Sequence, residues 1–377
     1  MLKRPLFMPV IAFVILLTFQ PIAAQSSTPK ITWTQVSQER TASVGISPDG
    51  KQIIFGSSAT KQLTVMDWQT KKVVWQVSQY IDTVSTSNWS PDGKYIATLS
   101  GGSIYIYEVA TGHHVSQIES SLNAYEDLLG LLTGSASLGF GYTDLKWNAD
   151  GGQLAVMVYG YILICNLPSG TITTVVDLVG LPLPNDLHTY LSWFDWSPDG
   201  SKFAAFHYKI DDKGQVPFPL DIVMGFWDKN GYLLPDKSLS SEPCVPDGQE
   251  IFNGFASPVG EDIAWAPDNK TVVVIVDTIG GNLHSTICTL QSDGKLLVKE
   301  LSDPIGGEIH WSSDQKWLFG MDTGCDLFIT DVANNYTTNI EHFAETCDST
   351  SSNWSQNGQQ VVIGGGDGLW VGTVQFP

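Results

Sequence analysis

Charged residues, and positive charge above all, are scarce in this chain. Lys, Arg, Asp and Glu make up 15% of the 377 residues, and 19 basic residues stand against 39 acidic ones, which gives a formal net charge of −20. A surface this acidic repels phosphate backbones and anionic lipid headgroups. We therefore expect no nucleic-acid partner. The low charge also argues against long charged helices and favours short strands joined by tight turns.

Common catalytic motifs are absent as well. The sequence contains no Gly-x-Ser-x-Gly elbow, no His-Glu-x-x-His pair and no glycine-rich phosphate loop. Each of these motifs places a nucleophile, a metal ion or a phosphate where its chemistry needs it. Their absence favours a protein without catalytic activity.

Cysteine is rare, with five residues and no Cys-x-x-Cys pair of the metal or redox type. An odd number leaves at least one thiol unpaired in a monomer. Cys165 and Cys288 lie within apolar runs that are typical of strands, and we expect both to be buried thiols.

The N-terminus has the three parts of an export signal. Lys3 and Arg4 are basic, residues 6–19 are largely apolar, and Ile22-Ala23-Ala24 supplies small residues for cleavage. We therefore expect a signal peptide at 1–24, a secreted or extracytoplasmic mature chain, and no membrane insertion after cleavage. No cysteine directly follows the apolar run, so no lipid attachment is expected. The alternative is an uncleaved membrane anchor.

One turn sequence recurs seven times along the chain. Its clearest copy is Trp89-Ser90-Pro91-Asp92-Gly93. Pro presets φ, Asp bonds the backbone that follows, and Gly takes the left-handed conformation that closes a hairpin. The copies are anchored near Ile46, Trp89, Trp147, Trp196, Trp265, Trp311 and Trp354.

The spacing of these anchors, 43 to 69 residues, predicts the architecture. A propeller blade of four strands takes about 40–45 residues. We therefore expect an all-β fold, a seven-bladed β-propeller of four-stranded antiparallel blades, as a single domain over 25–377. The seventh blade is one strand short after its anchor, while an orphan strand lies at 31–36. The N-terminal strand is thus expected to pair into the last blade and close the ring.

The repeated Trp-Ser-Pro-Asp-Gly-Lys unit, followed by Ile-Ala and later by an Asp before a Thr-Gly turn, resembles the WD-repeat and TolB-like β-propeller superfamily. The resemblance covers residues 31–377. The chain lacks the Gly-His dipeptide of intracellular WD repeats and has one true Trp-Asp pair, Trp227-Asp228. An exported TolB-like relative fits better. These superfamilies include scaffolds, receptors and enzymes, so the resemblance implies a fold more than a function.

Extra residues accumulate in the connections at 120–141, 178–189, 240–260 and 210–220. In a propeller all four connections leave the blades on the same face, and loops on a rigid scaffold often carry function. Their apolar side chains predict a docking surface, whose candidate residues are Tyr125, Leu128, Leu131, Leu181, Leu183 and Phe218. The alternative is that these side chains pack on one another and plug the gap.

Two rings of residues near the anchors are candidates for a site at the axis. Three residues before the anchors stand Asp144, Asp262 and Glu308, whose oxygens suit Ca²⁺ or another divalent cation. The alternative is that they form hydrogen bonds between blades. One residue before the anchors stand Lys146, Asp195 and His310, which are placed to pair across neighbouring blades.

The topology also places Cys325 and Cys347 on one face, so we expect a disulfide between them. The leading expectation for function is an exported, monomeric, non-enzymatic scaffold that presents its loop-rich face to a protein, peptide or glycan partner. One alternative is a metal-dependent hydrolase or lactonase at the axial channel, in which His207, His284 or His310 meets Asp144 or Glu308. Another is a TolB-like component of cell-envelope assembly.

Overall fold

The computed structural model describes residues 29–376 apart from residues 42, 58, 79–83, 101–102, 119–143, 159–160, 176–186, 212–218, 233, 235–259, 279–281, 291–295, 302–307, 322–325, 343–350 and 367. The predicted signal peptide at 1–24, the six apolar loop residues (Tyr125, Leu128, Leu131, Leu181, Leu183, Phe218) and the pair Cys325 and Cys347 lie outside the described residues. Those expectations therefore stay predictions.

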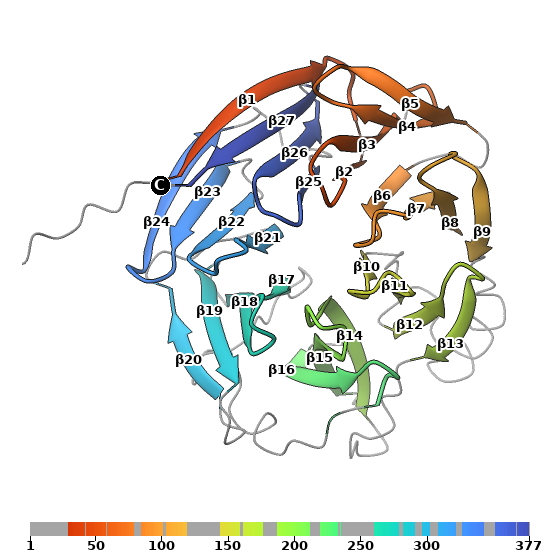
Figure 1. Cartoon of the computed structure of the whole chain (residues 1–377). Helices are drawn as coiled ribbons and strands as arrows, with labels where there is room; N and C mark the ends of the chain where they lie inside the picture. The colour runs from red at the N-terminus through yellow and green to blue at the C-terminus, as the bar shows by residue number, and fades with distance from the viewer. Residues whose placement is uncertain are drawn as a thin grey trace, which may run out of the picture.

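Seven antiparallel sheets stand as blades around a central axis, as Figure 1 shows. We number the blades from the anchor at Ile46. Blade 1 contains β2 (Ser43–Ile46), β3 (Gln52–Ser57), β4 (Gln62–Asp67) and β5 (Lys72–Val77); blade 2 contains β6 (Val84–Trp89), β7 (Tyr95–Ser100), β8 (Ser103–Glu108) and β9 (His114–Ile118). Blade 3 contains β10 (Asp144–Trp147), β11 (Gln153–Val158), β12 (Tyr161–Asn166) and β13 (Thr171–Val175).

The second half of the ring repeats the pattern. Blade 4 contains β14 (Leu187–Trp196), β15 (Lys202–Asp211) and β16 (Pro219–Asp228); blade 5 contains β17 (Gly260–Trp265), β18 (Thr271–Thr278), β19 (Asn282–Leu290) and β20 (Leu296–Glu300). Blade 6 contains β21 (Glu308–Trp311), β22 (Trp317–Met321), β23 (Asp326–Asp331) and β24 (Tyr336–His342). Blade 7 contains β25 (Ser351–Trp354), β26 (Gln360–Gly365), β27 (Gly368–Gln375) and, from the other end of the chain, β1 (Lys30–Ser37).

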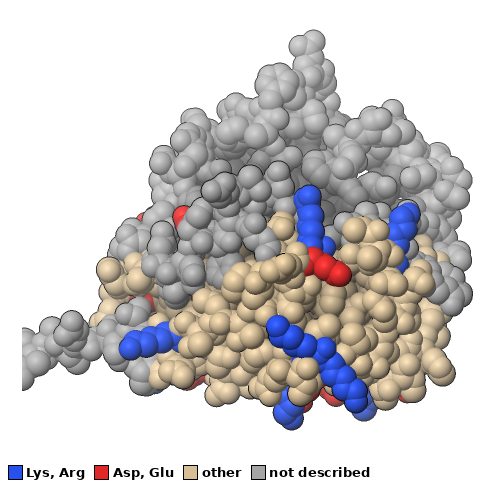
Figure 2. Space-filling model, turned by 90° about the horizontal axis from the view of Figure 1, so that it is seen from above, with Lys and Arg blue, Asp and Glu red and all other residues tan. Residues whose placement is uncertain are grey.

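The predicted seven-bladed propeller is therefore confirmed. Blade 4 shows three strands within the described residues. After the third strand, the N–H of Leu234 donates to the carbonyl of Phe226 in that strand at 2.8 Å. No helix occurs in the described ranges, and none there is long and apolar enough to cross a membrane. On the face drawn in Figure 2, the described Lys and Arg side chains are scattered, and some lie beside Asp or Glu.

Ring closure by the N-terminal strand is also confirmed. β1 pairs antiparallel with β27, with Trp33 opposite Gly372. A Cβ on Gly372 would lie 2.5 Å from the Trp33 indole, so the ring packs directly over the glycine backbone. The closure joins the two ends of the chain and covers the edge that β27 would otherwise expose.

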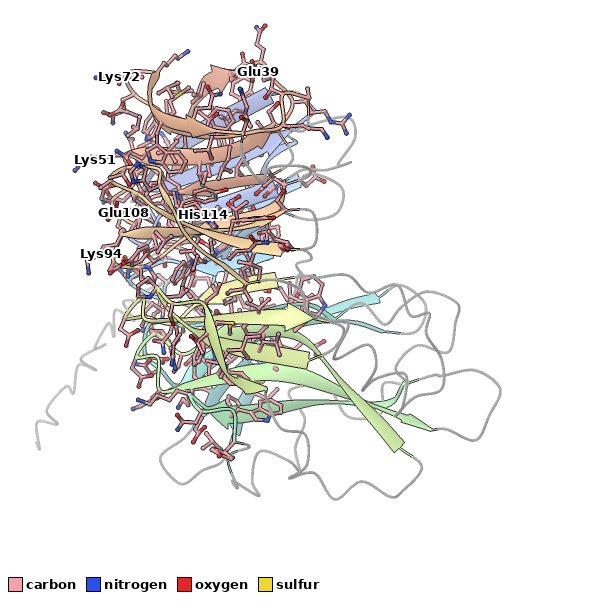
Figure 3. All side chains as sticks on the ribbon, turned by 90° about the vertical axis from the view of Figure 1, so that its right-hand side faces the viewer. Glu39, Lys51, Lys72, Lys94, Glu108 and His114 are labelled. Carbon is pink, nitrogen blue, oxygen red and sulfur yellow. The ribbon has the colours of Figure 1, made fainter. Side chains whose placement is uncertain are left out.

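The Ser-Pro-Asp-Gly turn is a compact hydrogen-bonded unit. Ser90 Oγ donates to Asp92 Oδ1 at 2.7 Å, and the N–H of Tyr95 donates to Ser90 Oγ at 2.9 Å. Burial raises the pKa of Asp92, but hydrogen bonds from Lys94 and Ser90 outweigh burial and bring that pKa below its usual 3.8. Equivalent turns lie at the same end of the ring, where Figure 3 labels Lys51 and Lys94. The conspicuous aspartate of the repeat thus stabilises a hairpin.

The hydrophobic core lies between neighbouring blades. Between blades 3 and 4, for example, Ile164 and Ala155 pack with Phe203 and Trp227, whose rings stack at 5.6 Å. Fully burying an aliphatic or Phe side chain contributes roughly 1.5–3 kcal/mol. Because every blade shares two such faces, the ring holds its inner strands, and the side chains on them, in fixed positions.

The two cysteines expected to be thiols differ from each other. Cys165 is a buried thiol, as predicted, and burial raises its pKa to about 12. Cys288 was predicted wrongly, because it is disulfide-bonded, to a partner outside the described residues. The physical reason is that an apolar strand accommodates a half-cystine as readily as a thiol, so the local sequence cannot distinguish them.

Candidate functional site

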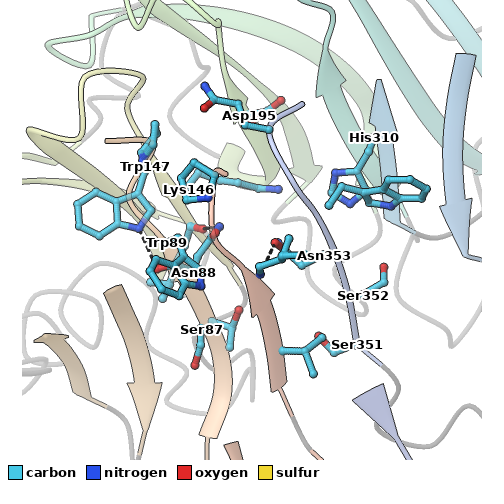
Figure 4. A pocket seen from close by; sticks show the side chains of 18 residues that line it. Ser87, Asn88, Trp89, Lys146, Trp147, Asp195, His310, Ser351, Ser352 and Asn353 are labelled. Carbon is cyan, nitrogen blue, oxygen red and sulfur yellow. Dashed lines mark hydrogen bonds between the residues drawn. The ribbon is translucent and has the colours of Figure 1, made fainter. Parts of the chain in front are cut away.

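A cavity of about 290 Å³ lies at the axis of the ring (Figure 4). Its walls come mainly from the inner strands of blades 7, 1, 2 and 3, with Asp195 from blade 4 and His310 from blade 6. Five of its side chains occupy one position of the repeat, directly before the anchor: Asn88, Lys146, Asp195, His310 and Asn353. The cavity is therefore built from equivalent positions of different blades.

Side chains alternate along a strand, so an anchor residue and the residue before it face opposite neighbouring blades. Anchor indoles face the preceding blade. Trp147 Nε1 donates to the carbonyl of Asn88 at 3.2 Å, and Trp196 Nε1 donates to the carbonyl of Lys146 at 3.2 Å. Trp311 Nε1 donates to the carbonyl of Ala264 at 3.1 Å. These three anchors thus bond their inner strands to the inner strand of the preceding blade.

The residue before the anchor faces the following blade. Asp195 Oδ2 accepts a hydrogen bond from the N–H of Trp265 at 2.9 Å, and its Oδ1 accepts one from the N–H of Trp196 at 2.9 Å. Asn353 Oδ1 accepts one from the N–H of Ile46 at 3.1 Å. These contacts satisfy backbone groups that an inner strand exposes at the axis. Asp195 therefore contacts the following blade through a backbone N–H, and pairing among the side chains of Lys146, Asp195 and His310 stays a prediction.

The proposed cation ligands are placed on three inner strands. Asp144 begins β10 and Glu308 begins β21, but their side chains lie outside what the structure describes. Asp262 is buried, with Oδ1 accepting from the N–H of Ile263 at 2.8 Å and Oδ2 accepting from the N–H of Ile309 at 2.7 Å. Oδ2 of Asp262 thus joins blade 5 to blade 6, while Oδ1 bonds within its own strand, and this favours the alternative role for this residue. The cation site stays a prediction.

His310 and Lys146 give the cavity its electrostatic character. Burial lowers the pKa of His310 to about 3, and the positive charge of Lys146 contributes to the same shift. The imidazole is therefore neutral near pH 7. The His310 ring also lies 6.1 Å from the Trp354 ring, centroid to centroid. The side chains of His207 and His284 lie outside the described residues, so their approach to this site stays a prediction.

Sequence reasoning missed the two asparagines of this ring. Asn88 Nδ2 donates to the carbonyl of Leu145 in the next blade at 3.5 Å, whereas Asn353 Oδ1 accepts from the N–H of Ile46. The signal was present, because both residues occupy the same repeat position as Lys146, Asp195 and His310. Amides do not titrate, however, and a search for charged groups passes over them.

Comparison with known proteins supports the fold. No family model matches the chain. Over 78 residues, 20% of this chain, it is 33% identical to the Periodic tryptophan protein 2 homolog of Mus musculus and 28% identical to Periodic tryptophan protein 2 of Saccharomyces cerevisiae. The matched region spans 8% of the length of either relative. Over 235 residues, 60% of this chain and 69% of the relative, it is 26% identical to an uncharacterised protein of Agrobacterium fabrum.

Among solved structures, a chain of hydrazine synthase from Kuenenia stuttgartiensis is similar, with a TM-score of 0.61 over 91% of this chain and 97% of that chain. At 15% identity this likeness shows the fold and carries no activity. The comparisons therefore support a β-propeller related in sequence to WD-repeat proteins.

Proposed function

We propose that this chain is an exported, non-enzymatic propeller scaffold that binds a protein, peptide or glycan partner through the face opposite the Ser-Pro-Asp-Gly turns. The proposal rests on the hydrogen bonds that polar side chains at the axis make between blades. Asp195, Asp262 and Asn353 direct their oxygens to backbone N–H groups of neighbouring blades. Groups committed to holding the ring together support a rigid framework more than a catalytic centre.

The bounds of the strands support the choice of face. β9 ends at Ile118 and β10 begins at Asp144, whereas β6 and β7 are separated by a turn of five residues between Trp89 and Tyr95. Connections of more than about 12–15 residues are uncommon in compact domains and are often functional. The long connections join outer strands to the next inner strand, so they leave the blades at the end opposite the turns.

A binding experiment with matched variants tests this proposal. The mature chain, residues 25–377, is immobilised and exposed to culture supernatant and cell-envelope extract of the source organism. One variant replaces Tyr125, Leu128 and Leu131 with Ser; its control replaces Val73, Val74 and Val115, which are exposed on outer strands, with Ser. We expect the wild type and the control to retain one specific partner and the loop variant to lose it.

Retention by the loop variant, or loss in the rim control alone, would contradict the chosen face. A partner of the cell-envelope assembly machinery would favour the TolB-like version of the proposal. The identity of the retained molecule decides whether it is a protein, a peptide or a glycan.

The second candidate is a metal-dependent hydrolase or lactonase, and the axial cavity with Lys146, Asp195 and His310 favours it. Metal analysis of the purified protein distinguishes the two functions. Stoichiometric metal that is lost on Asp144→Ala, Asp262→Ala and Glu308→Ala would support the enzyme. Metal-free protein with unchanged partner binding would support the scaffold.

A further inference from the structure

The axial cavity offers hydrogen-bonding groups that the described protein does not use. Asn353 Oδ1 accepts a hydrogen bond from the N–H of Ile46, but its Nδ2 makes no hydrogen bond to any described residue. The hydroxyls of Thr86 and Ser351 likewise make none within the described part of the chain, and both residues are only half-buried. Polar groups in such a position are completed by water or by a ligand. The wall therefore presents donors and acceptors to whatever occupies the cavity.

Aromatic surface lies beside these polar groups. Trp89, Trp147 and Trp354 all line the cavity; Trp89 and Trp147 are buried between blades, and Trp354 is half-buried. Sites for small molecules combine apolar and aromatic walls with a few placed polar groups. The mixture suits a molecule that has both hydroxyl groups and carbon–hydrogen faces.

The charges of the cavity favour an uncharged occupant. Among its lining residues Lys146 carries one positive charge, Asp195 carries one negative charge, and His310 is neutral. The formal charge of the lining therefore sums to zero. An anionic ligand would also meet the repulsion of a chain whose net charge is −20.

We propose that this cavity binds a small, uncharged, hydroxyl-rich molecule, of the size of a monosaccharide or a sugar alcohol. A volume of about 290 Å³ admits such a molecule and excludes a folded partner. The inference is independent of the loop face, because the walls come from inner strands and turns. Fixed inner strands leave the site preformed, which lowers the entropic cost of binding.

Calorimetric titration of the mature protein tests the proposal. The probes are glucose, galactose, mannose, N-acetylglucosamine and mannitol, with glucuronate as the charged counterpart of glucose. We expect one neutral probe to bind with a stoichiometry of one. Ser351→Leu fills the wall with a larger side chain and should weaken binding at least about tenfold, a change of about 1.4 kcal/mol. The matched control Ser313→Leu lies on an exposed turn and should leave affinity unchanged.

A second variant tests the same proposal in case Ser351→Leu does not fold. Thr86→Val removes one hydroxyl with little change of shape and should weaken the same probe several-fold while circular dichroism stays unchanged. The proposal is overturned if no neutral probe binds at about 10 mM, if folded Ser351→Leu and Thr86→Val bind as the wild type does, or if glucuronate binds more tightly than glucose. The loop variant of the partner experiment should still bind the sugar, so the two proposals fail separately.

Discussion

Asn353 in the last blade accepts a hydrogen bond from the backbone N–H of Ile46 in the first blade, with Nδ2 of the same amide left for the cavity. The two residues are 307 positions apart in the sequence. At the rim, β1 and β27 join the same two ends of the chain. The ring is thus closed twice, once at its outer edge by backbone pairing and once at its axis by a side chain.

The outer closure depends on Gly368, which begins β27. Its φ of 109° is unfavourable for any residue with a side chain, and a Cβ there would clash with the carbonyl oxygen of Ser37. We expect Gly368→Ala to lower the free energy of unfolding by about 1–3 kcal/mol. Gly366→Ala is the matched control, because no atom lies within 4 Å of its Cβ position. Urea denaturation measures both, and equal effects would contradict this reading of the closure.

The same Asp→Asn change should cost much more stability at Asp262, which bonds two blades together, than at Asp49 in a turn. Asp262→Asn replaces one of two accepting oxygens with an NH₂ group that faces a backbone donor, so we expect a loss of about 2–4 kcal/mol. Asp49→Asn should cost under about 0.5 kcal/mol. The seventh blade shows why, since Asn357 Oδ1 accepts from Ser355 Oγ at 2.7 Å and from the N–H of Gln359 at 2.9 Å. A comparable loss of stability in both variants would overturn the assignment of Asp262.

His310 should make stability depend on pH in the mildly acidic range. Its pKa in the folded protein is about 3, below the ordinary value of 6.5, so the unfolded chain takes up a proton that the folded chain does not. Stability attributable to His310 is therefore full above pH 6.5 and falls as the pH decreases toward 3. The slope reaches at most about 1.4 kcal/mol per pH unit.

Urea denaturation between pH 7 and 5 measures this slope before most carboxylates titrate. His310→Gln should flatten it, whatever that variant does to stability at pH 7. His113→Gln changes an exposed histidine and should keep the slope of the wild type. An unchanged slope in His310→Gln would mean that the buried imidazole is not the source.

Local chemistry explains how much of this architecture the sequence predicts. The turn around Asp92 is encoded within six residues, each with its own conformational reason, so seven copies mark seven blades. The contact from Asp195 to Trp265 is different, because it depends on two blades being neighbours. Its position in the repeat was visible, but the bonding partner emerges only when the ring is assembled. The disulfide of Cys288 is non-local in the same way.

The orientation of the Cys288 side chain indicates which blade its disulfide partner lies near. Cys288 lies opposite Val272, and Val272 lies opposite Trp265, so all three side chains share one face of blade 5. The Trp265 ring packs on the ring of Phe226 in blade 4 at 5.7 Å, which identifies that face as the one toward blade 4. Ile287, on the other face, packs with residues of blade 6.

Cys288 therefore faces blade 4, whose last described residue, Leu234, precedes Cys244 by ten positions. In the sequence, Cys325 directly precedes β23 and Cys347 follows β24, both strands of blade 6, which is the blade that Cys288 faces away from. We expect disulfides Cys244–Cys288 and Cys325–Cys347, with Cys165 alkylated only after unfolding, because its thiol is buried. Proteolysis without reductant, followed by mass spectrometry, identifies the linked peptides. A peptide joining Cys288 to Cys325 or Cys347 would contradict both pairings, whereas Cys165→Ser should leave the map unchanged.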